Sequence, residues 1–201
     1  MKSVLISIRP EWVEKICHEI EKDKNGKPIY EKRIEVRKSA PKEVPFKAYI
    51  YCSYGDMKTN YYLKGRGKVI GEFVCDKVFL LHPYSYDGGN ADLGHRKFIQ
   101  TFEGASKVIE ILSSTCLSQN EMFDYIGGGN YGYGWHISKL KIYDKPKELR
   151  EFYTIPERGS DCCCSCVCNE TPLDEMPCRT CTRERNYLYR PPQSWQYVEE
   201  I

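Results

Sequence analysis

Apolar and charged side chains alternate between Arg33 and Arg37, and this alternation constrains the fold more than any other part of the chain. Ile34 and Val36 stand between Arg33, Glu35 and Arg37. Apolar residues at every second position are typical of a half-buried strand with one face towards a core. Side chains two positions apart on the other face lie roughly 6–7 Å from each other. A row of cation, carboxylate and cation on that face either neutralises itself or binds a polar ligand.

The composition is that of an ordinary globular protein without a strong overall charge. The chain has 201 residues, enough for one domain with an elaboration or for two small domains. Lys and Arg number 30 and Asp and Glu number 28, which leaves a net charge of +2. This balance does not favour binding to duplex DNA or to an acidic membrane. Residues 27–47 are locally basic, with Lys and Arg in excess of Glu.

The cysteines are distributed unevenly. The chain has 11 Cys, of which Cys17, Cys52, Cys75 and Cys116 lie singly in apolar patterns, while the others crowd into 162–181. The amino-terminal sequence shows no signal-peptide hydrophobic region, and no apolar run is long enough to span a membrane. We therefore expect a cytoplasmic protein that is not membrane-bound. In a reducing compartment the crowded cysteines indicate metal-bound thiolates rather than disulfides.

The crowded segment contains a clear C-x2-C pair, Cys178 and Cys181. Together with two upstream thiolates, this pair would form a tetrahedral four-Cys Zn²⁺ site, whose Zn–S bonds of roughly 2.3 Å require close convergence. No open ligand position is indicated, so we expect the zinc to be structural. Cys163 and Cys166 are the preferred upstream pair. The alternatives are Cys166 with Cys168, a set that includes Cys164, an iron–sulfur cluster, two metals with bridging thiolates, or a metal-free loop.

Short strands dominate the expected secondary structure. Four further runs have strand character: residues 4–8, 46–52, 135–143 and 191–198. Residues 68–81 form a run too long for one straight strand, which predicts a bend or bulge near Gly71. We expect residues 82–101 to be irregular.

Helices are expected at three places. Pro10 begins one whose apolar residues recur at helical spacing as far as Ile20, with Asn25 and Gly26 ending it. A modest helix or buried segment is indicated around 108–112. A capping box that begins at Ser118 precedes a short helix. Many short strands with one early amphipathic helix predict an α+β fold, a small mixed β-barrel flanked by short helices.

Five motifs in this order resemble proteins with an ASCH domain, which belong to the PUA-like superfamily. ISIRPEW at 6–12, K-x-x-E-x-R-K at 32–38 and VIGEF at 69–73 are similar to the domain itself. WHIS at 135–138 and PPQSW at 191–195 look like the longer ASCH proteins of phages and prophages. The resemblance covers nearly the whole chain. It implies a PUA-like pseudo-barrel with an open cleft beside the first helix.

The resemblance also implies binding of RNA or nucleosides. Some members deacylate N4-acetylcytidine, and at least one type cleaves single-stranded RNA. The deacylase motif reads Lys-Thr-x-Thr-x-Arg, in which the Lys and the second Thr take part in the chemistry. On this chain the Lys falls on Lys32 and the Arg on Arg37, while Arg33 and Glu35 replace the Thr residues. A carboxylate in place of the second Thr argues against direct transfer of that mechanism.

Lys32, Glu35 and Arg37 are the expected centre of a ligand cleft. Arg37 can hold a phosphate or carbonyl group bidentately, and Lys32 can supply a point charge or, if desolvated, a base. Glu35 can accept a hydrogen bond from a base amino group, or a proton. The alternative is an exposed ladder of salt bridges, which would contribute little to stability.

Five further side chains are candidates for the same site: Ser7, Arg9, Lys38, Glu72 and Ser138. Ser7 and Arg9 lie where the first strand leads into the first helix. Glu72 is the candidate for a second cleft carboxylate, although a surface position is an equal alternative. Ser138 is expected to line the cleft through hydrogen bonds rather than to act as a nucleophile with His136.

The leading hypothesis is a cytoplasmic ASCH module that binds RNA or a nucleotide-like ligand. A hydrolase is the second hypothesis, either an N4-acetylcytidine amidohydrolase or a single-stranded ribonuclease, with Lys32, Glu35 and Glu72 in catalytic roles. The third is a protein-interaction module that uses the zinc loop. The expected division is an ASCH/PUA-like domain at 1–158, a Cys-rich zinc insertion at 159–186 and a closing strand at 187–201. The sequence gives no indication of the oligomeric state.

Overall fold

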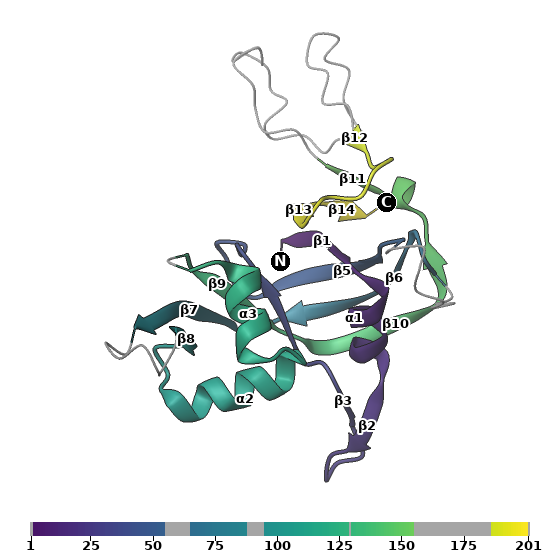
Figure 1. Cartoon of the computed structure of the whole chain (residues 1–201). Coiled ribbons are helices and arrows are strands. Elements are labelled where there is room, and N and C mark those ends of the chain that lie inside the picture. The colour runs from purple at the N-terminus through teal and green to yellow at the C-terminus, as the bar shows by residue number, and fades with distance from the viewer. Residues whose placement is uncertain (1, 55–64, 88–94, 129, 155–185, 201) are drawn as a thin grey trace, which may run out of the picture.

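The computed structural model describes residues 2–54, 65–87, 95–128, 130–154 and 186–200. Strands dominate, with three α-helices among the described residues (Figure 1). This arrangement confirms the sheet-rich α+β class. None of the described helices has the length and apolar character needed to cross a membrane. The ladders between described strands do not establish closure into a barrel, which therefore stays a prediction.

A five-stranded sheet carries most of the core. Its order is β10 (Ser138–Lys147), β6 (Lys68–Cys75), β5 (Phe46–Cys52), β1 (Ser3–Ile8) and β13 (Trp195–Tyr197). β1 runs parallel to β5 and antiparallel to β13, which places the amino-terminal strand between a neighbour early in the chain and one near its end. The predicted strands at 4–8 and 46–52 are confirmed, and the predicted closing strand is present as β13.

Helix α1 (Pro10–Cys17) packs on one face of this sheet (Figure 1). Its buried residues Val13 and Ile16 join a core cluster with Ile8, Ile50 and Phe73 of the sheet. Pro10 occupies the first helical turn, where its missing N–H costs no hydrogen bond. The helix leaves the end of β1 directly, so the last residues of β1 and the first turn of α1 form one corner.

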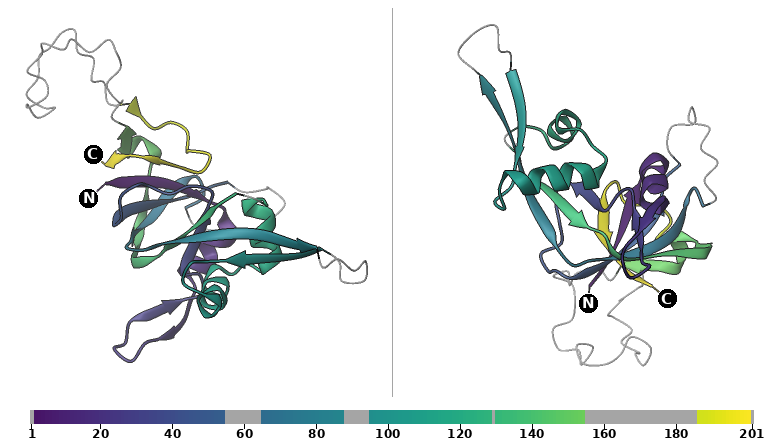
Figure 2. Two further views of the ribbon diagram at one scale, coloured as in Figure 1. Left: turned by 90° about the vertical axis from the view of Figure 1, so that its left-hand side faces the viewer. Right: turned by 90° about the horizontal axis from the view of Figure 1, so that it is seen from below.

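The predicted continuation of the first helix to Ile20 is wrong. α1 ends at Cys17, and β2 (Glu19–Lys22) and β3 (Pro28–Tyr30) form a projecting hairpin (Figure 2). The carboxylate of Asp23 accepts hydrogen bonds from the backbone N–H groups of Asn25 and Lys27, and Gly26 has a φ of 77°. These are the contacts of a tight turn, so Asn25 and Gly26 reverse a hairpin rather than end a helix.

A second, four-stranded sheet lies beside the first. Its order is β4 (Ile34–Arg37), β9 (Gly132–His136), β7 (Val78–Asp87) and β8 (His95–Gln100). Helices α2 (Ala105–Thr115) and α3 (Gln119–Ile126) cover it and share a core cluster with it. The capping box predicted at Ser118 is confirmed, because Ser118 and Glu121 each bond the other's backbone N–H.

Two of the passages from one sheet to the other are short. β6 ends at Cys75 and β7 begins at Val78, and β9 ends at His136 before β10 begins at Ser138. The single strand predicted for 135–143 is therefore two strands.

The bulge predicted near Gly71 is confirmed, since the register of β5 and β6 shifts between the pairs of Gly71 and Val69. The expectation that 82–101 is irregular is wrong, because β7 and β8 pair there.

The last described elements form a small sheet near the carboxyl end. After the short helix η1 (Leu149–Glu151), its strands have the order β12 (Asn186–Tyr187), β11 (Phe152–Thr154) and β14 (Glu199–Glu200). The two ends of the described chain lie close together, as the N–H of Val198 bonds the carbonyl of Ser3 at 3.0 Å. The Cys-rich segment lies outside the described residues, so the three predicted domain boundaries stay predictions.

Candidate functional site

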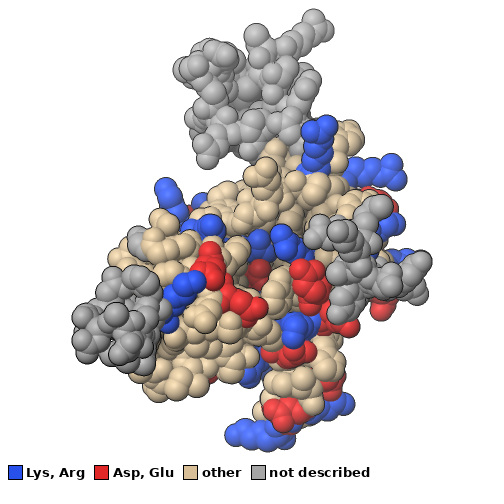
Figure 3. All heavy atoms as spheres, viewed as in Figure 1, with Lys and Arg blue, Asp and Glu red and all other residues tan. Residues whose placement is uncertain are grey.

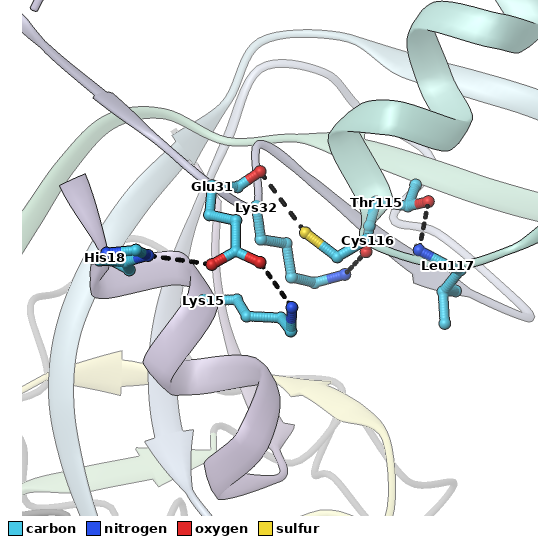
Figure 4. Close-up of polar contacts among 7 residues, drawn as sticks. All are labelled: Lys15, His18, Glu31, Lys32, Thr115, Cys116 and Leu117. Atoms are coloured by element: carbon cyan, nitrogen blue, oxygen red, sulfur yellow. Dashed lines mark hydrogen bonds and ion pairs between the residues drawn. The ribbon is translucent and has the colours of Figure 1, made fainter. Parts of the chain in front are cut away.

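The residues before β4 are clamped between two helices. The N–H of Lys32 bonds the carbonyl of Lys15 in α1 at 3.0 Å, and the N–H of Arg33 bonds the carbonyl of Ser114 in α2 at 2.8 Å. On the α1 side, Glu31 is ion-paired with Lys15 at 2.5 Å and hydrogen-bonded to Nδ1 of His18 at 3.0 Å (Figure 4). These contacts fix the backbone from which the Lys32 side chain departs.

Lys32 is 2% exposed and is held by three groups. Its Nζ donates to the carbonyl oxygen of Thr115 at 2.8 Å (Figure 4). The same Nζ lies 3.3 Å from Oε2 of Glu35 and 5.0 Å from the ring centroid of Trp12. Thr115 is the last residue of α2. A helix ends in carbonyl groups without intrahelical partners and with partial negative charge, so this end is a natural acceptor for an ammonium group.

Glu35 and Arg37 continue the buried charge along β4. The Nη2 of Arg37 lies 2.9 Å from Oε1 of Glu35 and donates to the carbonyl of Ser7 at 2.7 Å. Glu35 is 6% exposed and Arg37 is 7% exposed. The Nε of Arg37 is buried and has no hydrogen-bond partner among the described residues. We refer to Lys32, Glu35 and Arg37 as the charged floor.

The charged floor lines a cavity of about 590 Å³. From α1 and the end of β1 come Ser7, Ile8, Arg9 and Trp12. Residues 191–193 line the cavity beside Ser7, which donates to the carbonyl of Pro192, and Leu117, Glu121 and Tyr125 of α3 and its approach also line it. Figure 3 shows a hollow on this face, with basic and acidic atoms at its bottom. The volume is within the usual range for small-molecule sites, about 300–1,000 Å³.

Five of the predicted site residues therefore line one cavity: Ser7, Arg9, Lys32, Glu35 and Arg37. The alternative of an exposed ladder of salt bridges along β4 is wrong, because all four residues of this strand are buried. Residues of α1, α3 and 191–193 line the cavity together with the side chains of the charged floor. The roles assigned to these residues remain predictions.

Three predicted residues are not part of the cavity lining. Glu72 accepts a hydrogen bond from the Tyr143 hydroxyl at 2.6 Å and lies 3.4 Å from the Lys47 ammonium. Its neighbour Phe73 packs in the cluster beneath α1, so Glu72 points to the opposite face of the sheet. Burial of Glu72 opposes ionisation, but these two contacts hold its pKa below the ordinary value.

Ser138 and Lys38 also lie outside the lining. The Ser138 hydroxyl donates to the carbonyl of Val74 at 2.8 Å, which ties β10 to β6. Lys38 is exposed, and its Nζ lies 5.6 Å from the ring centroid of Tyr125. Tyr125 lines the cavity, so Lys38 is adjacent to its edge without entering it. The imidazole of His136 pairs with Asp76 at 2.6 Å.

Sequence reasoning missed the aromatic and apolar walls. Trp12 stood within a quoted motif but not among the candidate site residues, and Leu117 and Tyr125 had no motif at all. Burial raises the pKa of Tyr125, an effect that the nearby guanidinium groups of Arg37 and Arg9 oppose. Leu117 and Tyr125 lie far from β4 in the sequence, and the packing of α3 brings them to the cavity.

The described cysteines are free thiols. Burial raises the pKa of Cys17 and of Cys52 to about 11 and that of Cys75 to about 12, so these thiols stay protonated and suit a core. The described residues contain no group of three or more potential metal ligands. The predicted zinc ligands Cys163, Cys166, Cys178 and Cys181 lie outside the described residues.

Comparisons with solved structures give a weak likeness to an ASCH protein. No family model matches the chain, and no curated protein matches it. The crystal structure of ASCH from Zymomonas mobilis is 14% identical over 98% of this chain and 88% of that one, with a TM-score of 0.48. Two mutant forms of that protein give TM-scores of 0.49 and 0.43 at 15% and 16% identity, over 98% and 74% of this chain and 89% and 77% of theirs. Similarity at this level identifies neither an activity nor a ligand.

Proposed function

We propose that the chain is an ASCH-type, PUA-like module whose cavity binds a nucleoside or one nucleotide of single-stranded RNA. The observation that supports this most directly is the charged floor at the bottom of an open cavity. Burial of charged groups is costly even when they are paired. Two cations and a carboxylate held together beneath empty space therefore suit a polar ligand better than they suit a core.

The walls of the cavity support the same ligand class. Trp12 and Tyr125 line it from α1 and α3, and Arg9 lines it next to Trp12. Unpaired bases stack on aromatic rings, while sugar and phosphate groups are bound by Lys and Arg. The aromatic rings and cations around this cavity provide both kinds of contact within a volume that fits one nucleoside.

Titration of the protein with nucleosides and short single-stranded RNA, followed by calorimetry, tests this proposal. Stacking of one base contributes about 1–3 kcal/mol, so Trp12→Ala should weaken binding by about tenfold or more. Arg9→Ala should weaken binding of RNA and reduce its salt dependence if Arg9 contacts a phosphate.

Phe102→Ala is the matched control for Trp12→Ala, because Phe102 is an exposed aromatic residue outside the lining. It should bind like the unchanged protein. Failure of the unchanged protein to bind any nucleoside or RNA would contradict the proposal, as would normal binding by a folded Trp12→Ala variant.

Hydrolysis is less well supported than binding. Both carboxylate oxygens of Glu35 contact cations of the floor, so a proton-transfer role requires Glu35 to leave these contacts. Glu72, the other predicted catalytic carboxylate, contacts Tyr143 and Lys47 instead. Release of acetate from N4-acetylcytidine, or cleavage of labelled single-stranded RNA, would favour the hydrolase over the binding module.

We further propose that the Cys-rich segment binds one structural zinc ion in the reducing cytoplasm, with Cys163, Cys166, Cys178 and Cys181 as ligands. The pairing of Thr154 with Asn186 in β11 and β12 brings the two ends of this segment together, which suits a closed metal loop. Because a zinc site stabilises the segment that folds around it, a strong chelator should lower the melting temperature.

Elemental analysis of the purified protein checks the zinc proposal. We expect about one zinc per chain, in keeping with one four-Cys site. Cys178→Ser should lose this zinc, whereas Cys116→Ser should keep it, because Cys116 is a free thiol among the described residues and is not one of the proposed ligands. A fully folded protein with less than about half an equivalent of zinc would contradict a structural site.

A further inference from the structure

The charged floor carries more hydrogen-bond donors than its contacts with described residues satisfy. An ammonium group has three N–H donors and a guanidinium group has five, about eight together for Lys32 and Arg37. Their described contacts reach the carbonyls of Thr115 and Ser7 and the two carboxylate oxygens of Glu35. About half of the donors therefore have no protein acceptor in these contacts.

One of the donors without an acceptor in these contacts can be identified as the Nε–H of Arg37. Arg37 is 7% exposed and lines the cavity, and its Nε has no partner among the described residues. A buried N–H without an acceptor is unfavourable, and a ligand acceptor that reaches it removes this cost. Each oxygen of Glu35 already contacts one cation, which leaves about two of the four acceptor sites of this carboxylate against about four open donors, so the floor offers a ligand more donors than acceptors.

We infer that the cavity selects nucleobases that present carbonyl oxygens and discriminates against adenine. This inference rests on the proposed nucleoside site. Uracil has two carbonyl oxygens and guanine has one, whereas adenine has none and places an amino group beside its ring acceptors. An adenine amino group directed at the floor meets the N–H donors of Lys32 and Arg37. Neither the amino group nor these donors then find an acceptor in each other. A uracil carbonyl accepts from Arg37 and from Lys32.

A phosphate group offers the same acceptor chemistry as a carbonyl, and the choice of probes separates the two. The test is calorimetric titration of the full chain with uridine, adenosine and ribose 5-phosphate. Uridine should bind at least about tenfold more tightly than adenosine, because one unsatisfied polar contact has an effect of this size. Ribose 5-phosphate should bind more weakly than uridine. Equal affinity for uridine and adenosine, or tighter binding of ribose 5-phosphate, would overturn the inference.

Arg37→Lys tests the contact itself. This variant keeps the positive charge but removes the Nε–H and the planar fork. We expect the preference for uridine over adenosine to fall to less than about threefold. A folded variant that retains the full preference would overturn the role of Arg37, and the comparison of ligands on the unchanged protein decides the selectivity even if the variant does not fold.

The outcomes also separate this inference from the proposed function. If adenosine binds as tightly as uridine, the cavity is a nucleoside site without the inferred selectivity. If no nucleoside and no RNA bind, the proposed function itself fails.

Discussion

Glu35→Ala should destabilise the protein by about 3–5 kcal/mol, the range measured when one member of a buried charge group is removed. The carboxylate lies 3.3 Å from the Lys32 ammonium and 2.9 Å from the Arg37 guanidinium. Without it, two buried cations remain close together with no counter-charge between them. The free energy of unfolding in urea measures the effect.

Two further variants identify the cause of this loss. Glu43→Ala removes the partner of Lys2 from an exposed pair and should leave stability close to that of the unchanged protein. Lys32→Met in the Glu35→Ala background removes one of the two stranded cations and should recover part of the lost stability. An effect of Glu35→Ala no larger than that of Glu43→Ala would show that the floor is not the buried charge group described above.

Trp135→Ala should cost about 3–5 kcal/mol as well, because it leaves a large cavity in the core. Trp135 is fully buried, and its ring lies 4.9 Å from the ring of Phe46 and 5.8 Å from that of Trp195. It belongs to β9, yet it packs in the core cluster of the five-stranded sheet. Loss of this side chain therefore weakens the contact between the two sheets.

Trp135→Phe is the matched variant for this prediction. It keeps an aromatic ring in the core and removes the indole N–H, which is buried without a partner among the described residues. We expect a clearly smaller loss than for Trp135→Ala, since the smaller cavity is partly offset by removal of that N–H. Equal losses for the two variants in thermal unfolding would contradict the packing role of this residue.

The sequence predicted correctly those strands and helices that a short stretch of residues determines. β1 and β5 were predicted from their apolar runs, and α3 from the capping box at Ser118. The hairpin after α1 also had a local signal, Asn25 followed by Gly26, but helical periodicity through Ile20 outweighed it in the prediction. In the structure Ile20 is 54% exposed, so its apparent place on the helix face was coincidental.

The cavity depends on contacts that no local pattern contains. Lys32 bonds the carbonyl of Thr115, 83 residues away, and Ser7 donates to the carbonyl of Pro192, 185 residues away. The alternation in β4 indicated which side chains share a face, but not that other elements cover that face. For the same reason Glu72 was placed with the cations, although its strand directs it to the far side of the sheet.

The central claim, that this cavity holds a nucleobase, is tested most directly by nitrogen-15 NMR during titration with uridine. The chain has 3 Trp residues and hence one indole N–H signal for each. We predict that the signals of the Trp12 indole and the Arg37 Nε–H shift and saturate together, while that of Trp135, buried in the core, stays in place. Saturable binding that leaves both the Trp12 and the Arg37 signals unmoved would contradict the account.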